Sequence, residues 1–294
     1  MHSRLGDQAV QLEEPLAESA PVAEELAEKR CLIGPDGISC AWNHGFWQYL
    51  RLLELVLSPS SRVAFYREAF ARVQRPSPRI LISGASDYSM LAVVLAAFRD
   101  RKMQPRVTVI DVCETPLALS RWYAERVSAS IEVHAIDVRD YDSQEPFDAV
   151  CSDGFFGRFR QDERPTVVAR WKALLRPSGI AVTLNRVRGG ADNGPIAFNA
   201  AQQQAFSEAV RRAAAACAGL EAQADALAER AALYAERHFT YPVSQGELLE
   251  LFTGARFRIE HVDVAEPRGG SNEAGSAPSV RGFNSYAGLV ARRA

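Results

Sequence analysis

The chain has 294 residues, of which 47% are hydrophobic and 24% charged, which is enough for one sizeable domain with added segments. A formal net charge of −2 gives little attraction to nucleic acid or to anionic membranes and argues against both as partners. No apolar run approaches the length of a membrane span, and the first residues lack the basic flank and apolar core of a signal peptide. We therefore expect a soluble, cytoplasmic protein.

The cysteines are odd in number and scattered, and none forms a CxxC pair; they are Cys31, Cys40, Cys113, Cys151 and Cys217. This pattern is typical of a reducing compartment. It predicts neither a disulfide framework nor a structural zinc site, so no metal is expected.

The chain opens with two segments that differ in composition. Residues 1–30 are rich in Ala, Glu and Pro with almost no aromatic residues, and we expect a poorly ordered acidic segment, with a short helix as the alternative. Residues 31–76 carry apolar positions at helical spacing from Trp47 to Leu57, followed by a second amphipathic stretch capped by Ser61. They predict a helical N-terminal lid ahead of the main domain.

From residue 77 to 294 strand and helix patterns alternate. RILISG, VTVIDV, IEVHAID, FDAVCSD and GIAVTLNRV read as strands, with helices or short crossover segments between them. This alternation predicts an α/β fold, a doubly wound, mostly parallel sheet covered on both faces. Residues 189–241 read as a helical insertion broken near Gly219, and SYAGLVARR forms the last strand.

The residues that follow the strands are the candidate site, because open α/β sheets bind ligands at the carboxyl ends of their strands. A glycine turn follows the first strand, and acidic residues follow the next three. These positions are Gly84, Ser86 and Asp87, then Asp111, then Asp137 with Val138, and then Asp153.

These strand ends, together with WKALLRPSGIAVTL and the C-terminal strand, resemble the class I S-adenosylmethionine-dependent methyltransferases. The resemblance covers about Arg79 to Ala294, less the insertion. It implies a seven-stranded Rossmann-like sheet, S-adenosyl-L-methionine as cofactor, Asp111 as the ribose ligand, and Asp137 with Val138 at the adenine. The cofactor-contacting residues expected are Trp47, Gly84, Ser86, Asp87, Asp111, Val112, Asp137, Val138 and Asp153.

The glycine loop departs from the family pattern of acid-x-Gly-x-Gly-x-Gly. Ile82 stands at the acid position, and Ser86 and Tyr88 replace the second and third glycines. A pyrophosphate would be repelled by Asp87, whereas a sulfonium and an ammonium group suit an acidic loop. The loop therefore favours S-adenosylmethionine over a nicotinamide dinucleotide, and no role follows for Tyr88.

Three side chains are candidates for the catalytic base: His44, Asp87 and His238. For each histidine the alternative is a structural residue with its hydrogen bonds satisfied.

Aromatic residues with polar edges, as in AWNHGFWQY, suit a lid over a cationic cofactor. Tyr49, Arg186 and Tyr241 are the expected substrate contacts, since a guanidinium at the strand ends can hold a carboxylate. For Arg186 the alternative is a solvated rim.

The function that these observations predict is methyl transfer to a small molecule, with an amino-acid-like acceptor, a methionine-type thioether included. The acceptor atom, O, N or S, stays open. The alternatives are a non-methylating protein that kept the fold and, less favoured, a nicotinamide-dependent oxidoreductase. The chain lacks the Asn/Asp-Pro-Pro-Tyr/Phe stretch that many base methyltransferases carry, which also argues against nucleic acid as substrate. A homodimer is an open alternative to a monomer.

Overall fold

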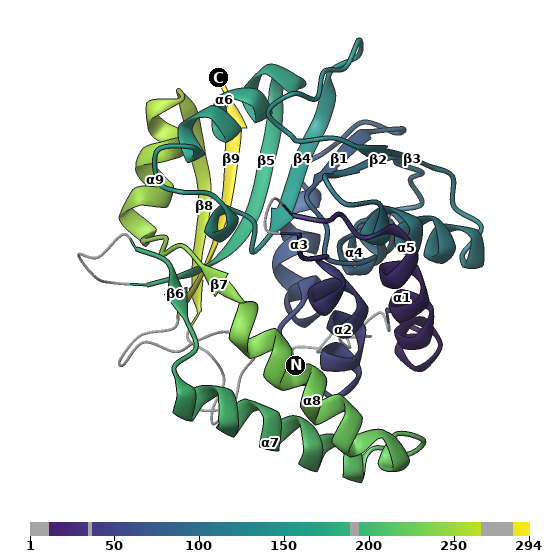
Figure 1. Cartoon of the computed structure of the whole chain (residues 1–294). Helices are drawn as coiled ribbons and strands as arrows, with labels where there is room; N and C mark the ends of the chain where they lie inside the picture. The colour runs from purple at the N-terminus through teal and green to yellow at the C-terminus, as the bar shows by residue number, and fades with distance from the viewer. Residues whose placement is uncertain (1–11, 35–36, 189–193, 266–284) are drawn as a thin grey trace, which may run out of the picture.

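A computed structural model describes residues 12–34, 37–188, 194–265 and 285–294. Its centre is a seven-stranded sheet with the strand order β3-β2-β1-β4-β5-β9-β8 (Figure 1). The first five strands in the chain are parallel, and β9 runs antiparallel to both of its neighbours. The predicted doubly wound, mostly parallel sheet is confirmed. The strands are β1 (Arg79–Ser83), β2 (Arg106–Asp111), β3 (Ile131–Ala135), β4 (Phe147–Asp153), β5 (Leu175–Val187), β8 (Phe257–Ala265) and β9 (Ser285–Arg293).

Both faces of the sheet are covered because successive residues of its strands point to opposite sides. In β1, Ile80 and Ile82 join one hydrophobic cluster and Leu81 joins the other. The first cluster contains residues of α3 (Val63–Phe70), α4 (Ser89–Arg99) and α5 (Glu114–Arg126). The second contains residues of α6 (Arg164–Leu174) and α9 (Gln245–Gly254).

The N-terminal segment is more ordered than its composition indicates. Residues 16–30 form helix α1 (Leu16–Arg30), which packs against α5 and against α2 (Ala41–Leu52). Ala20, Ala23 and Ala27 are fully or almost fully buried, and these small side chains allow the close helix packing. The expectation of a poorly ordered segment is therefore wrong for residues 16–30, because tertiary packing stabilises a helix that composition alone does not predict. Residues 1–11 lie outside the described part of the chain.

The insertion folds as a helical hairpin under the sheet (Figure 1). Helices α7 (Ala200–Ala216) and α8 (Ala224–Arg237) are separated around Gly219, as predicted. Phe206 and Tyr234 of this pair share a hydrophobic cluster with Phe46 and Leu50 of α2. A two-stranded sheet of β6 (Ile196–Ala197) and β7 (Phe239–Thr240) was not predicted, since two-residue strands carry no periodicity. Three short 3₁₀ helices complete the fold: η1 (Pro59–Arg62), η2 (Phe156–Arg158) and η3 (Glu221–Gln223).

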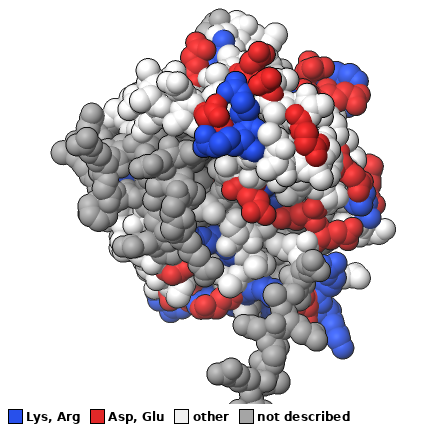
Figure 2. All heavy atoms as spheres, turned by 90° about the horizontal axis from the view of Figure 1, so that it is seen from below, with Lys and Arg blue, Asp and Glu red and all other residues white. Residues whose placement is uncertain are grey.

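The surface carries charges of both signs. On the face seen from below, Lys and Arg side chains lie among Asp and Glu side chains, and the described residues form no continuous basic area there (Figure 2). Within the described ranges, no helix is long and apolar enough to cross a membrane.

Candidate functional site

A cavity of about 1150 Å³ lies at the carboxyl ends of the parallel strands. The ends of β1, β2 and β4 form one wall, and residues of α2, α8 and β7 form the other. Such a volume accommodates a nucleoside-sized cofactor together with a small second molecule. The cavity is lined by all of the predicted cofactor-contacting residues, by the three predicted catalytic residues and by Arg186.

Gly84 ends β1 in a conformation that suits glycine. Its φ is +78°, and its N–H donates to the carbonyl of Ile110 at 2.9 Å. A Cβ added at this position would lie 2.4 Å from Cε2 of Phe155. The single glycine of the loop is therefore required both by its backbone angle and by the aromatic ring beside it.

We expect Gly84→Ala to destabilise the fold by about 3 kcal/mol, because a positive φ costs ~1–2 kcal/mol and the displaced ring adds to it. Gly154→Ala is the matched control, since Gly154 also has a positive φ, +63°, but an added Cβ would meet no atom within 4 Å. Denaturant unfolding of the two variants checks this. Equal losses would contradict the role of the ring of Phe155.

Asp111 is fixed at the end of β2 by the backbone. Its two carboxylate oxygens accept hydrogen bonds from the N–H groups of Ala85, at 3.0 Å, and Cys113, at 2.8 Å. Burial raises the pKa of Asp111, while the charge of His44 and the two N–H donors lower it. Each oxygen keeps a lone pair that can accept a further hydrogen bond from a hydroxyl group.

Asp137 follows β3 and is held by its neighbour. Arg139 donates to both carboxylate oxygens of Asp137, at 3.0 and 2.7 Å, and this pairing lowers the pKa of Asp137 below its usual range. Arg139 also bonds to Glu163, at 3.0 Å. Asp137 therefore lines the cavity as a carboxylate that already has a partner, and the side chain of Val138 is buried beside it.

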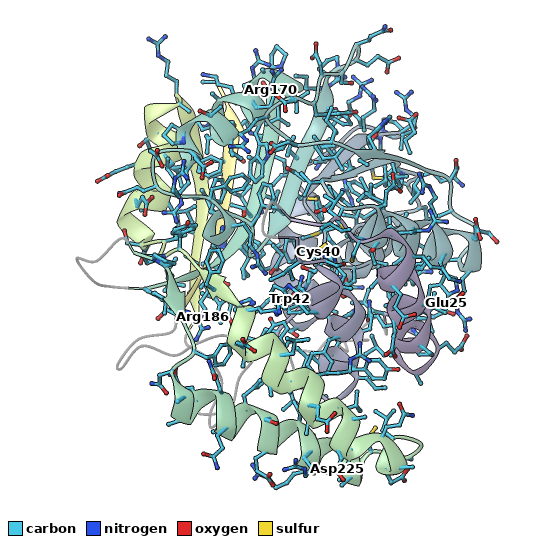
Figure 3. All side chains as sticks on the ribbon, viewed as in Figure 1. Glu25, Cys40, Trp42, Arg170, Arg186 and Asp225 are labelled. Atoms are coloured by element: carbon cyan, nitrogen blue, oxygen red, sulfur yellow. The ribbon has the colours of Figure 1, made fainter. Side chains whose placement is uncertain are left out.

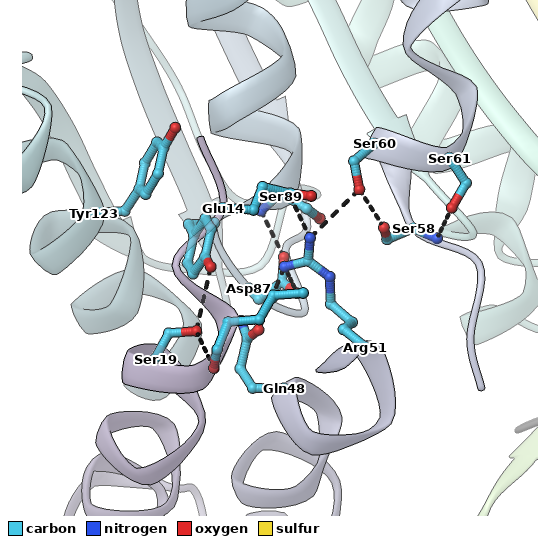
Figure 4. A network of polar contacts seen from close by, with 12 residues as sticks. Glu14, Ser19, Gln48, Arg51, Ser58, Ser60, Ser61, Asp87, Ser89 and Tyr123 are labelled. Carbon is cyan, nitrogen blue, oxygen red and sulfur yellow. Dashed lines mark hydrogen bonds and ion pairs between the residues drawn. The ribbon is translucent and has the colours of Figure 1, made fainter. Parts of the chain in front are cut away.

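Asp87 is part of a buried ion-pair network (Figure 4). Arg51 donates to Asp87 at 2.9 Å and also bonds to Glu14, and the other oxygen of Asp87 accepts from the N–H of Ser89 at the start of α4. Both carboxylate oxygens of Asp87 therefore already accept hydrogen bonds from within the protein. The geometry thus argues against Asp87 as a catalytic base and gives it a structural part in the loop.

Tyr88 also has a structural role, as a buried packing residue. Its buried ring stacks on Tyr123, with 4.5 Å between the ring centroids, and its hydroxyl lies 3.2 Å from that of Ser19 in α1. The position of the family's third glycine is thus filled by a ring that packs between α1 and α5, outside the residues that line the cavity.

Asp153 ends β4 and has an environment unlike that of the other acids. Burial raises the pKa of Asp153 to about 7, although a hydrogen bond from Tyr66 (2.6 Å) and the charge of Arg62 lower it. Asp87 raises it further. Asp153 is thus a cavity-lining carboxyl group that gains or loses its proton near neutral pH.

His44 lies among cysteines. Its Nδ1 is 3.4 Å from Sγ of Cys31 and 3.6 Å from Sγ of Cys40, and Cys113 completes a group of four residues. Its Nδ1 is thus already in contact with two thiol groups, which argues against His44 as a general base.

Arginine side chains line the cavity as well as the acids. Arg158, Arg186 and Arg237 all line the cavity, and none of them pairs with a carboxylate among the residues that the structure describes. Arg186 extends from the end of β5, and burial lowers its pKa. Figure 3 shows Arg186 at the lower end of the sheet, and both Arg186 and Trp42 near the upper end of α8.

His238 lines the cavity near these arginines. Its ring stacks on Tyr234, with centroids 4.9 Å apart, and its Nδ1 is buried with no hydrogen-bond partner among the described residues. Burial and the charges of Arg158, Arg186 and Arg188 keep the pKa of His238 well below its usual value. His238 is thus a neutral imidazole at neutral pH, able to accept a hydrogen bond but weak as a base.

Two predicted substrate contacts lie outside the cavity lining. Tyr49 is buried, and its hydroxyl donates to Glu24 at 2.9 Å while Arg230 lies over its ring. Tyr241 donates its backbone N–H to Gly157, and its ring packs edge-on against Phe239. Helical periodicity explains why Tyr49 does not line the cavity together with Trp47. Tyr49 lies two positions after Trp47 and so points to another side of α2.

Sequence reasoning also missed residues that line the cavity, namely Phe155, Arg158, Phe159, Tyr234, Arg237 and Tyr286. Phe155 and Phe159 could have been identified from the sequence, because they follow the acid at the end of β4. The residues of α8 could not, since periodicity does not reveal where a helical insertion packs.

Comparisons with known proteins agree with the fold. Residues 92–179 match the family model of a methyltransferase domain. A search of curated proteins found no match.

Three solved structures are similar at low sequence identity. 1,6-Didemethyltoxoflavin-N1-methyltransferase of Burkholderia thailandensis, solved with 1,6-didemethyltoxoflavin and S-adenosylhomocysteine, is 17% identical, with a TM-score of 0.50 over 99% of this chain and 97% of that one. The [4+2]-cyclase SpnF is 15% identical, with a TM-score of 0.52 over 80% and 81%. A possible exported protein of Bordetella parapertussis is 14% identical, with a TM-score of 0.50 over 93% and 79%. At these identities the likeness shows the fold alone.

Proposed function

We propose that this chain is a class I methyltransferase that uses S-adenosylmethionine and that it methylates a small molecule carrying an anionic group. The observation that carries the proposal is that Arg158, Arg186 and Arg237, which have no carboxylate partners among the described residues, line the same cavity as the strand-end acids. The two sets of side chains suit ligand groups of opposite charge.

The residues that line the cavity at the strand ends fit the cofactor. Asp111 would hold the ribose hydroxyls, and Val112, Ile136 and Val138 would flank the adenine. Gly84 lines the cavity at the end of β1 without a side chain, and an added Cβ would collide with Phe155. When bound, S-adenosylmethionine supplies a methyl group on a sulfonium cation, which acidic and aromatic neighbours favour. Because Arg51 already neutralises Asp87, the acids that carry this argument are Asp111 and Asp153.

The cavity-lining arginines Arg158, Arg186 and Arg237 fit an anionic acceptor. An arginine at a cavity can bind a carboxylate with two parallel hydrogen bonds, and removal from water strengthens that pairing. Arg186 is the best placed of the three, since it extends from the end of β5 toward Tyr286 and the cavity. Trp42 and Tyr234 supply apolar surface for the rest of the molecule.

Asp153 is the residue we assign as proton acceptor for an O–H or N–H acceptor group. Its pKa, raised to about 7 mainly by burial, is close to that of an efficient general base at neutral pH. Tyr66 holds one carboxylate oxygen at 2.6 Å and so fixes its orientation. The remaining contribution of the chain is alignment of the reacting groups in a cavity that excludes water.

Arg186→Gln tests the proposed substrate class. For an anionic acceptor we expect KM to rise at least about 30-fold, since loss of a buried charge-assisted pair costs ~2 kcal/mol or more, while KM for a neutral analogue stays within threefold. Transfer of a labelled methyl group from S-adenosylmethionine to matched carboxylates and carboxamides provides the measurement. Arg212→Gln on the surface of α7 is the control. A preference of the wild type for the neutral analogues would refute the anionic substrate class.

A further inference from the structure

Cys31, Cys40, His44 and Cys113 form a cluster of side chains that can act as metal ligands. The side-chain ligand atoms of these four residues all lie within 4.8 Å of one another. They come from three segments: the end of α1, the start of α2, and the loop between β2 and α5. The cysteines are free thiols, and Figure 3 shows Cys40 near the centre of the molecule.

We propose that these four residues bind one zinc ion tetrahedrally. Four distances carry the proposal: His44 Nδ1 lies 3.4 Å from Cys31 Sγ and 3.6 Å from Cys40 Sγ, and Cys113 Sγ lies 3.6 Å from Cys40 Sγ and 3.8 Å from Cys31 Sγ. A tetrahedral zinc with Zn–S of about 2.3 Å and Zn–N of about 2.0 Å has S···S edges of about 3.8 Å and S···N edges of about 3.5 Å. The observed separations match that tetrahedron.

The competing interpretations explain less of the geometry. A disulfide needs the two sulfurs at about 2.0 Å and would leave the third cysteine and the histidine unused. Thiols packed as small apolar groups would not need an imidazole nitrogen directed into the middle of three sulfurs. A set of three thiolates and one imidazole is a ligand set that tetrahedral zinc prefers among the common divalent ions.

Neighbouring groups support the ligands. The hydroxyl of Thr115 lies 3.1 Å from Cys31 Sγ, where it can donate to a thiolate. The N–H of Cys113 donates to Asp111, so the backbone of one ligand is fixed by the proposed ribose acid. Cys40 and His44 are four residues apart at the start of α2, a spacing that places both on one helix face.

Zinc here would be structural, since all four ligands come from the protein and no position is left for a substrate. The ion would join Cys31, Cys40 and His44 to Cys113 in the β2–α5 loop. Leu32, Ile38, Trp42 and Asn43, between Cys31 and His44 in the chain, line the cavity. Metal binding would therefore hold the cavity wall in place and, through Cys113 and Asp111, favour cofactor binding. This last coupling rests on the proposed function, whereas the metal site does not.

The first test is the metal content of the full chain, produced without a histidine tag in medium containing Zn²⁺. We expect one zinc per chain after gel filtration, and replacement by Co²⁺ should give the visible absorption bands of tetrahedral cobalt with thiolate ligands. Cys40→Ser and Cys113→Ser should lose the metal, and Cys217→Ser, which changes a cysteine in the insertion, should keep it. X-ray absorption of the wild type should show three sulfurs and one nitrogen, which needs no variant to fold.

Substoichiometric zinc in the wild type would overturn the site, as would retention of zinc by both ligand variants or an intact mass two daltons low from a disulfide. The second test compares the affinity for S-adenosylhomocysteine of the zinc-loaded and the chelator-treated protein. We expect the treated protein to bind at least about tenfold more weakly. Equal affinities would refute the coupling. Stoichiometric zinc with no S-adenosylhomocysteine binding in either form would refute the proposed function and leave the metal site standing.

Discussion

Replacing Asp153 by Asn is expected to lower kcat by about 100-fold or more for an oxygen or nitrogen acceptor, the usual contribution of a positioned general base. The amide keeps the size of the side chain and can still accept the hydrogen bond from Tyr66, but it cannot take a proton. In the wild type, kcat/KM at saturating cofactor should rise with pH as Asp153 loses its proton, with a midpoint at or below pH 7. A sulfonium close to the carboxylate would lower the pKa of Asp153 from its value of about 7 in the cofactor-free protein.

The same variant gives a stability readout with a defined sign. The folded-state pKa of Asp153 is raised by burial, so the proton stabilises the fold below the unfolded pKa, and that stabilisation is lost as pH rises through about 7. Asp153→Asn should therefore unfold at a higher temperature than the cofactor-free wild type at pH 9, and the difference should shrink as the pH falls from about 7 toward the unfolded pKa. Asp162→Asn, in an exposed turn, is the control. A flat pH profile with full activity in Asp153→Asn would show that no base is needed, as for a thioether acceptor.

Asp111→Asn is expected to weaken S-adenosylhomocysteine binding by about 100-fold. Two hydrogen bonds from ribose hydroxyls to a carboxylate are worth ~1.5 kcal/mol each, and the amide also points a donor at one of the two N–H groups that Asp111 now accepts from. Asp137→Asn should have the smaller effect, since Arg139 already occupies that carboxylate. Calorimetry on both variants, with thermal unfolding to verify the fold, provides the comparison. A larger loss in Asp137→Asn would reverse the assigned importance of the two acids.

The sheet and its order of elements could be predicted because strands of a parallel sheet carry short apolar runs that end at the same edge. β4 was predicted from Phe147 to Asp153 and β9 from Ser285 to Arg293, with the observed bounds. The strand-end acids followed from the same rule, and all of them line the cavity.

What could not be predicted depends on contacts between distant segments. The pairing of Asp87 with Arg51 joins the glycine loop to α2, 36 positions earlier, and nothing local to the loop reveals it. It removes most of the electrostatic argument that Asp87 would repel a pyrophosphate. The preference against a dinucleotide now rests on Asp153 and on the single glycine of the loop, since an acid in the position of Asp111 binds a ribose in either kind of cofactor.

The cysteine cluster was missed for the same reason. The search for paired cysteines in CxxC spacing finds zinc sites whose ligands lie close together in the chain. Here Cys40 and Cys113 are 73 positions apart and meet only because the start of α2 lies beside the loop between β2 and α5. The expectation that the chain has no metal site followed from spacing alone, and the described structure gives a reason to test it.

We expect the strand-end cavity to bind S-adenosylmethionine and no nicotinamide dinucleotide. Calorimetric titration of the zinc-supplemented wild-type protein with S-adenosylhomocysteine, and separately with NADH, measures this directly. One S-adenosylhomocysteine site per chain and no heat of binding with NADH are expected. Binding of NADH without S-adenosylhomocysteine, or binding of neither, would contradict this expectation.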